Sequence, residues 1–322
     1  MKILFISSGY KGIYKYFEDW ILHELKKKHE VQHFQIKDGL HMLQSFIIAG
    51  KPDIALTLVG FKIPIKMTHL LKKWEVKTAI WFTEDPYFID KTNVLSNYYD
   101  FVFTIDTAAL EYYKKNGHKH AYHLPLATDL RVFQPKQVEA HYRSDICLVG
   151  YPYPERVQYI QHLLQHTDYK IKVVGTWKNS LSRFRNNRNL VIHEGWVEPS
   201  IVADFYNGAN IVLNTHRPFN LKNNQNRLGI AGKSINNRTF DAAACDSFQL
   251  IEFKEDLPNH FIEDEEMVAF RNYEELIQKI DHYMEFEEVR QKIANNARSR
   301  VLREHTFQHR LDKMLSIICN SP

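Results

Sequence analysis

The feature of this 322-residue chain that most constrains its fold is the alternation of short apolar segments with segments of helical periodicity. Residues 3–6, 53–59 and 78–82 are apolar or strand-like runs, and residues 14–28 carry apolar side chains at helical spacing. Continuous apolar runs of this length are typical of parallel strands that are buried on both faces. Strands separated by helices predict parallel sheets with right-handed crossovers.

The same alternation begins again after a loop with two prolines at residues 125–137. We therefore predict a first domain over residues 1–137, a second over 138–303 and a helical tail over 304–322. The predicted fold class is α/β, with two Rossmann-like parallel-sheet domains that face a cleft. Ligands in such sheets bind beyond the carboxyl ends of the strands.

Composition excludes several classes of protein. Hydrophobic residues make up 44% of the chain and charged residues 25%, which is ordinary for a globular protein. The net charge of +4 comes from scattered basic residues, so we expect no nucleic-acid surface, although an anionic small ligand fits. Cys147, Cys245 and Cys319 are too widely spaced for a disulfide framework or a zinc site, which favours a cytoplasmic location. No run has the length of a signal-peptide core or a membrane span.

Residues 236–251 predict a polar turn, a helix and a buried strand, with Asp241 in the first turns of the helix. Free backbone N–H groups and the helix dipole at such a turn can bind a diphosphate. An acidic side chain beside them can accept hydrogen bonds from ribose hydroxyls, so the segment suits a sugar nucleotide. The alternatives are that Asp241 is a solvated helix residue, that Arg238 is an ion-pair partner and that Ser234, Asn236 and Asn237 only form the turn.

Two acids follow the strand at residues 78–82. Glu84 and Asp85 would lie at the functional edge of the first sheet, where either could act as the general base for an acceptor hydroxyl. The alternative is that Asp85 and Pro86 form the cap and the first residue of a following helix. Gly9 and Gly12 follow the first strand; they allow a close backbone approach to a ligand, or form an ordinary turn.

The second domain contributes further candidates at strand ends. His216 and Arg217 follow residues 209–214, and Arg217 is either a phosphate ligand or a loop cation. Trp177 and Trp196 lie beside strand ends and are candidates for stacking on a base or sugar. The polar tract 220–227 is a lid over a ligand or a flexible loop. Because no Asp-x-Asp motif or His/Cys cluster is visible, we expect no metal in the site.

At this point the chain resembles a known family. Val149-Gly150, Val174-Gly175 and residues 193–197, 209–216 and 238–245 occur in the order seen in GT-B glycosyltransferases. The likeness is greatest to the CgeB/YkvP-like spore-protein glycosyltransferases, which also resemble this chain at residues 81–86, 99–104 and 124–127.

The resemblance implies that the second domain binds most of a nucleotide-sugar donor and that the tail over 304–322 packs back on the first domain. It places Asp241 at the ribose and residues 234–238 at the diphosphate. Trp196 and Val197 would lie at the nucleobase, Gly150 and Gly175 would face the donor, and the loop from Gly9 to Gly12 would lie near the sugar. This chain has Lys233 where many retaining relatives have a second acid, and Asp246 where many have glycine. Lys233 could neutralise phosphate charge as a point cation.

These observations predict a glycosyltransferase that uses a nucleotide diphosphate sugar, most consistent with a UDP-linked donor, and needs no cofactor. The resemblance implies an acceptor that is a spore or cell-surface component. Two alternatives stay open because of Lys233 and Asp246. One is a non-catalytic nucleotide-sugar-binding or structural spore protein, and the other is an epimerase or hydrolase of sugar nucleotides with the same fold.

Overall fold

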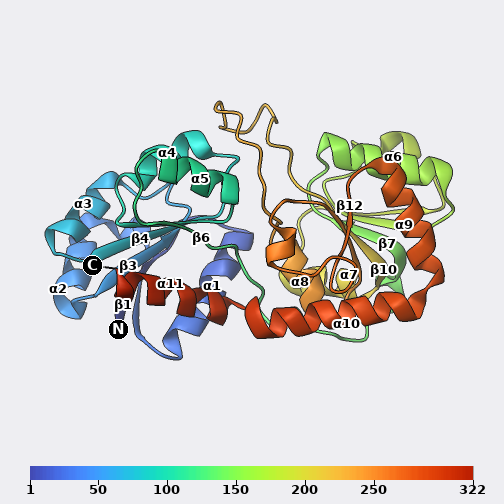
Figure 1. Ribbon diagram of the computed structural model, residues 1–322. Coiled ribbons are helices and arrows are strands. Elements are labelled where there is room, and N and C mark those ends of the chain that lie inside the picture. The colour runs from blue at the N-terminus through green and yellow to red at the C-terminus, as the bar shows by residue number, and fades with distance from the viewer. Residues whose placement is uncertain (322) are drawn as a thin grey trace. The chain divides into compact units, whose positions relative to one another are not determined.

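The computed structural model describes residues 1–321, which form two compact units. Unit 1 comprises Met1–Leu126, Phe219–Ser234 and the residues from Phe307 onward, and unit 2 comprises Ala127–Pro218 and Ile235–Thr306. Each unit is an α/β structure built on one parallel sheet, which confirms the predicted fold class (Figure 1).

Unit 1 contains a six-stranded sheet with the order β2-β1-β3-β4-β5-β6, in which every neighbouring pair is parallel. Its central strands are buried, as their apolar sequences predict, except for Lys77 at the start of β4. The strands are β1 (Lys2–Ile6), β2 (Glu30–Phe34), β3 (Ile54–Leu58), β4 (Lys77–Phe82), β5 (Phe101–Thr104) and β6 (Ala121–His123).

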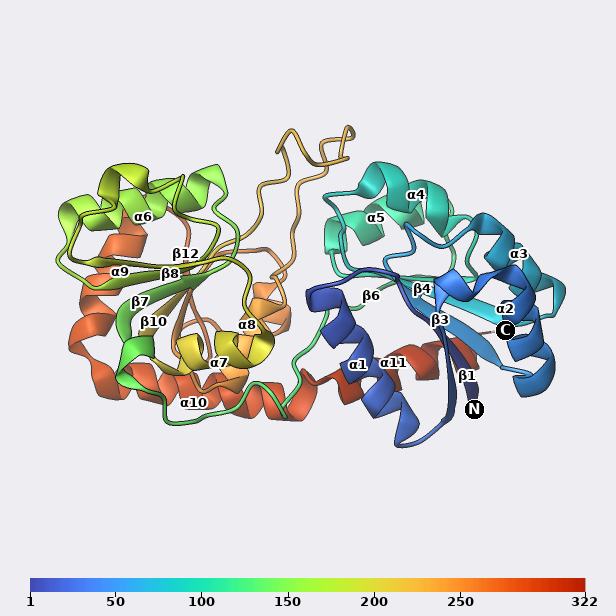
Figure 2. The ribbon, with the colours of Figure 1, turned by 180° about the vertical axis from the view of Figure 1, so that it is seen from behind.

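Helices cover both faces of this sheet. α2 and α3 pack against β1 and β3, while α4 and α5 pack against β4 and β5. α1 and α11 lie side by side on the opposite face (Figures 1 and 2). The buried ring of Phe307 contacts Phe17 and Trp20 there, and a phenylalanine in such a place stabilises a fold by roughly 3–5 kcal/mol relative to alanine. The helices are α1 (Ile13–Lys26), α2 (Gly39–Gly50), α3 (Ile65–Lys73), α4 (Ile89–Ser96), α5 (Thr107–Lys115) and α11 (Phe307–Asn320).

Unit 2 repeats the design with the strand order β12-β11-β10-β7-β8-β9, again wholly parallel. Its strands are β7 (Ser144–Val149), β8 (Ile171–Gly175), β9 (Leu190–Glu194), β10 (Ala209–Asn214), β11 (Gln249–Glu252) and β12 (Val268–Phe270). Its helices are α6 (Pro154–His166), α7 (Pro199–Asn207), α8 (Arg238–Ala244), α9 (Tyr273–Glu285) and α10 (Glu287–Glu304). α6 and α9 share one apolar core, and α8 contacts both α7 and α10.

The course of the chain between the units differs in detail from the predicted boundaries. The structure groups residues 127–137 with unit 2, where the Lys136 N–H group donates to Asn207 Oδ1 at 2.9 Å. The segment Phe219–Ser234 lies between β10 and α8 in sequence but belongs to unit 1. Its Gln225 N–H group donates to the carbonyl of Tyr87 at 2.8 Å, so the tract predicted as a lid or a flexible loop is attached to unit 1. No helix among residues 1–321 is both long and apolar enough to cross a bilayer.

Candidate functional site

The carboxyl ends of β7 and β8 in unit 2 meet at two glycines. A Cβ atom on Gly175 would lie only 2.4 Å from the carbonyl oxygen of Gly150, so no larger residue fits there. The indole Nε1 of Trp177 donates to the same carbonyl at 2.9 Å. Trp177 is fully buried in the apolar core of unit 2, so the expectation that its ring is available for stacking is wrong.

Two arginine side chains converge on the space above Gly150. A Cβ atom at this glycine would lie 2.9 Å from Arg156 Nη1 and 3.5 Å from Arg238 Nη1. Arg156 is only 2% exposed; its Nε donates to Thr215 Oγ1 at 2.8 Å and its Nη2 to the Thr215 carbonyl at 2.7 Å. These hydrogen bonds fix the orientation of the guanidinium. Arg156 was missed in the sequence, although it follows the strand–glycine pair by only six positions.

Arg238 is the first residue of α8 and turns back toward the end of β10. Its Nη2 donates to the carbonyl of Thr215 at 2.7 Å, the same oxygen that Arg156 binds. Asn236 fixes the turn before α8, because its Nδ2 donates to Asn214 Oδ1 at 2.9 Å. The turn and the strand edge are therefore held together by side chains, and both guanidinium groups are positioned before any ligand binds.

Several backbone N–H groups at the start of α8 have no hydrogen-bond acceptor among residues 1–321. The N–H groups of Thr239 and Phe240 donate to the carbonyls of Asn236 and Asn237. Within residues 1–321, we find no acceptor for the N–H groups of Asn236, Asn237 and Arg238. Unpaired donors at the start of a helix favour an anion.

Asp241 lies in the first turn of α8 and is only 6% exposed. Its Oδ2 accepts a hydrogen bond from Asn237 Nδ2 at 2.9 Å, while its Oδ1 is buried with no donor among the described residues. Burial raises the pKa of this carboxyl group well above its ordinary value, although the nearby Thr128 hydroxyl and then the Arg238 charge oppose the shift. Asp241 is therefore not a solvated helix residue; it retains one unused acceptor oxygen.

His216 is a buried structural residue at this edge. Its N–H group donates to Glu252 Oε2 at 2.8 Å, and its ring nitrogens lie 2.9 Å from the Glu252 carbonyl and 3.1 Å from Asn236 Nδ2. Burial is the main reason that the pKa of the His216 imidazole lies well below its ordinary value, and the charge of Lys254 lowers it further. The imidazole is therefore neutral. Arg217 is half-buried, with its guanidinium 5.9 Å from the centre of the Tyr153 ring.

Beyond β9, the indole of Trp196 is 60% exposed, whereas the side chain of Val197 packs against the cluster of Cys147, Val174 and Phe205. A large exposed indole beside a strand end can stack on a planar ligand. Trp196 is thus the better stacking candidate of the two tryptophans that the sequence indicated.

The two acids after β4 in unit 1 have different environments. Asp85 is 1% exposed and accepts hydrogen bonds from Thr92 Oγ1 at 2.6 Å, Thr104 Oγ1 at 2.8 Å and Tyr113 Oη at 2.8 Å. Burial is the largest influence on its pKa and raises it to about 7, although the three hydroxyl donors oppose the shift. The alternative that Asp85 caps a helix is wrong, because α4 begins only at Ile89.

Glu84 is half-buried, and its Oε1 accepts a hydrogen bond from the phenol of Tyr14. The ring of Tyr10 packs beside that of Tyr14. Burial raises the pKa of both phenols, and the negative charge of Glu84 raises it further. Glu84 is therefore the more accessible of the two candidate bases.

The loop between β1 and α1 holds Gly9 and Gly12, both at positive φ. Gly12 occupies the position before the helix with φ 65° and ψ −134°, a conformation available in practice only to glycine. Around it, the Ser8 N–H group donates to Glu18 Oε1 at 2.6 Å and Lys62 Nζ to the Gly9 carbonyl at 2.8 Å.

The segment predicted to surround a diphosphate, residues 234–238, crosses from one unit to the other. Ser234 and Lys233 belong to unit 1, where both of their N–H groups donate to Asp106 Oδ2, at 3.1 and 3.0 Å. Lys233 Nζ lies 3.2 Å from Glu111 Oε1. Within unit 2, the structure brings the guanidinium of Arg238 to Gly150, while Asn236 contacts the end of β10 and Asn237 contacts Asp241.

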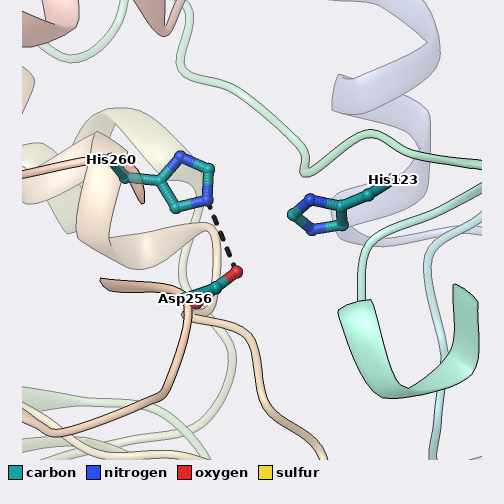
Figure 3. Close-up of side chains that lie close together, drawn as sticks. All are labelled: His123, Asp256 and His260. Carbon is teal, nitrogen blue, oxygen red and sulfur yellow. Dashed lines mark ion pairs between the residues drawn. The ribbon is translucent and has the colours of Figure 1, made fainter. Parts of the chain in front are cut away.

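Asp256 binds the backbone of Ile235, the residue at which the chain re-enters unit 2. Its Oδ1 accepts a hydrogen bond from the Ile235 N–H group at 2.8 Å, and its Oδ2 lies 3.4 Å from His260 Nε2 (Figure 3). The hydrogen bond from Ile235 ties the beginning of the turn before α8 to the segment that follows β11. His123, also labelled in Figure 3, belongs to unit 1, where its Nε2 lies 3.2 Å from the Ile105 carbonyl.

Comparison with known proteins assigns the family. Residues 143–316 match the family described as glycosyl transferase-like. The chain is 33% identical over 296 residues to the spore protein CgeB of Bacillus subtilis (strain 168), covering 91% of each chain. The chain therefore belongs to the glycosyl transferase-like family, as the motifs in the sequence predicted.

Solved structures identify the architecture. Anabaena Alr3699/HepE in complex with UDP-glucose superposes with a TM-score of 0.70 at 10% identity, covering 100% of both chains. Sucrose-phosphate synthase from Thermosynechococcus elongatus gives a TM-score of 0.68 at 10% identity, with 99% of this chain and 98% of that chain covered. Both likenesses show that the chain has the GT-B fold.

Proposed function

We propose that this protein transfers a sugar from a UDP-linked donor, and that unit 2 binds the donor's nucleotide. The observation that carries the proposal is the convergence of Arg156 and Arg238 above Gly150, next to unpaired N–H groups at the start of α8. Guanidinium groups match phosphate oxygens in charge and geometry, so this edge of the sheet suits a diphosphate. Complexes of the structural neighbour Alr3699/HepE with UDP and UDP-glucose support the choice of nucleotide.

In this proposal the two arginines also serve the reaction. Breaking the bond between sugar and diphosphate leaves negative charge on the departing phosphate, and prearranged cations stabilise that charge. Arg156 and Arg238 would supply this stabilisation without a metal ion. We expect transfer to continue unchanged when EDTA is added, and a rate that is lost with EDTA and restored by a divalent metal would contradict this point.

We further propose that Asp241 accepts a hydrogen bond from a ribose hydroxyl through its unused Oδ1. Because this atom is buried, the ribose must displace neighbouring side chains to reach it. The exposed indole of Trp196 would stack on the uracil beside the backbone of Val197. Gly175, His216 and Arg217 would support this edge, and Arg217 would bind a phosphate or an acidic acceptor.

Unit 1 would supply the base. Of the two acids after β4, Glu84 is the one we assign to deprotonate the acceptor hydroxyl, because Asp85 is enclosed by three hydroxyl donors. The loop with Gly9 and Gly12 would lie near the sugar. The name of the relative CgeB favours a spore or cell-surface acceptor, and the three free thiols favour synthesis of the product in the cytoplasm.

The test is a thermal-shift and calorimetry panel of UDP, GDP, ADP and several UDP-sugars, followed by measurement of UDP release with and without spore-wall extracts. A ligand that binds the native state raises the melting temperature, so UDP compounds should stand out from the panel. Release that depends on an acceptor supports transfer, and release without one indicates hydrolysis. Binding without release would favour a non-catalytic binding protein, and no binding of any UDP compound would overturn the proposal.

A further inference from the structure

Unit 2 contains a cavity at the amino-terminal edge of its sheet. This amino-edge pocket has a volume of about 570 Å³ and is lined by residues 135–137, the end of α7, the start of β10, the turn at residues 245–248 and the first half of α10. Ala209, at the start of β10, lines it, whereas Asn214, at the end of the same strand, holds the proposed donor site. Five steps along a strand span roughly 16 Å, so the two sites are separate.

Arg290 is the most informative residue of the amino-edge pocket. Its side chain is only 8% exposed, and its Nη1 donates to the carbonyls of Tyr283 and Met284 near the end of α9. In the part of the chain that the structure describes, no carboxylate lies within ion-pair distance of this guanidinium. Burial lowers its pKa, with Glu287 the only charge that opposes the shift.

The ordinary explanation for Arg290 is that it caps the carbonyls at the end of α9. That role uses one nitrogen of the guanidinium, and it does not require the side chain to line a cavity of this size. A buried cation without an acidic partner is costly, and an anionic ligand in the pocket would remove that cost. The other cation of the pocket, Lys136, is already paired with Asp204 at 2.6 Å, so Arg290 is the group available for an anion.

Asp246 supplies the second recognition group. It lies in the turn between α8 and β11 with φ 60°, a region that residues other than glycine rarely adopt. Its Oδ2 accepts a hydrogen bond from Gln291 Nε2 at 3.0 Å, and its Oδ1 is buried without a donor in residues 1–321. Rotation about χ2 of an aspartate is soft, so the unused oxygen can turn to a hydroxyl in the pocket. This residue is one of the two departures that the sequence showed and that the proposed donor site does not use.

We propose that the amino-edge pocket binds a small compound that carries both an oxyanion and hydroxyl groups, such as a sugar phosphate or a sugar acid. Arg290 binds the oxyanion, and Asp246, held by Gln291, accepts a hydrogen bond from a hydroxyl. The volume falls within the range of ordinary small-molecule sites. This inference does not depend on the activity proposed above.

Calorimetry on the full chain tests the proposal with glucose 6-phosphate, glucuronate, inorganic phosphate and glucose as probes, each with and without saturating UDP. Glucose 6-phosphate or glucuronate should bind more tightly than phosphate or glucose alone, and UDP should not displace them. The phosphate and carboxylate probes identify which oxyanion the pocket prefers. Displacement by UDP would place the probe in the donor site and overturn the proposal, as would the absence of binding by every probe at about 10 mM, where contacts worth even a few kcal/mol are detectable.

Variants then locate the binding site. Arg290→Gln keeps a donor for the Tyr283 carbonyl but removes the charge, so it should weaken the anionic probes by about tenfold or more. Asp246→Asn should weaken glucose 6-phosphate severalfold and leave inorganic phosphate unchanged. Arg303→Gln, an exposed change on the same helix, is the matched control and should have no effect. Unchanged affinity in both pocket variants, with an unchanged melting temperature as proof of folding, would refute the assignment.

Discussion

The replacement Asp85→Asn tests whether the buried carboxyl group in unit 1 is a structural residue that is protonated in the folded state. Its pKa is about 7 in the folded protein and 3.8 in an unperturbed side chain. Above pH 3.8 the Asp85 carboxyl group loses its proton in the unfolded chain, whereas in the folded chain it keeps the proton up to about pH 7. The wild-type protein should therefore lose stability as the pH rises through this window. At 1.36 kcal/mol per pKa unit the full loss is about 4 kcal/mol.

Asparagine has the same shape as aspartic acid but does not titrate, so the comparison isolates the carboxyl group. Between about pH 5 and pH 8 the free energy of unfolding of the wild type should fall by roughly 2.5 kcal/mol more than that of the variant. Urea titration followed by hydrogen exchange of peptides from β4 and β5 is the suitable assay, because a protein with two units need not unfold in one transition.

A difference between wild type and variant that stays constant over this pH range would refute the reasoning. It would show that the hydroxyl groups of Thr92, Thr104 and Tyr113 keep the carboxylate ionised against the effect of burial. The variant should also retain donor affinity and turnover, since Asp85 is enclosed. A loss of turnover with donor affinity and folding intact would return Asp85 to the role of base.

Three further replacements test the proposed donor and acceptor sites. Arg156→Gln should weaken UDP binding by roughly 1.5–3 kcal/mol, or about 10- to 100-fold, and leave uridine binding unchanged, because only a phosphate ligand uses the charge; calorimetry measures both. Glu84→Gln should lower kcat by about 100-fold or more with donor affinity unchanged, and an unchanged kcat would exclude Glu84 as the base. Asp241→Ala, which removes both acceptor oxygens, should abolish the preference for UDP over its 2′- and 3′-deoxy analogues; a variant that still discriminates would show that the ribose binds elsewhere.

The alternation of apolar and helical segments was sufficient to predict two parallel sheets, because strands that are buried on both faces appear in the sequence as continuous apolar runs. Elements that are short or have a weak apolar pattern were missed. β6 and β12 are short strands at the ends of their sheets, and α4 has a weak apolar pattern. The helix α6 was also missed, and with it the buried Arg156.

The sequence by itself determined the fold class, the family and the places where polar residues follow strand ends, since these depend on local patterns and on motifs in order along the chain. Only the tertiary structure decided what those residues do. It enclosed Asp85 and Trp177, attached Lys233 and Ser234 to unit 1, and brought Arg156 to Gly150 and Arg238. Burial and hydrogen-bond partners come from segments far apart in the chain, so they set the charge and accessibility of each group in ways that no local pattern records.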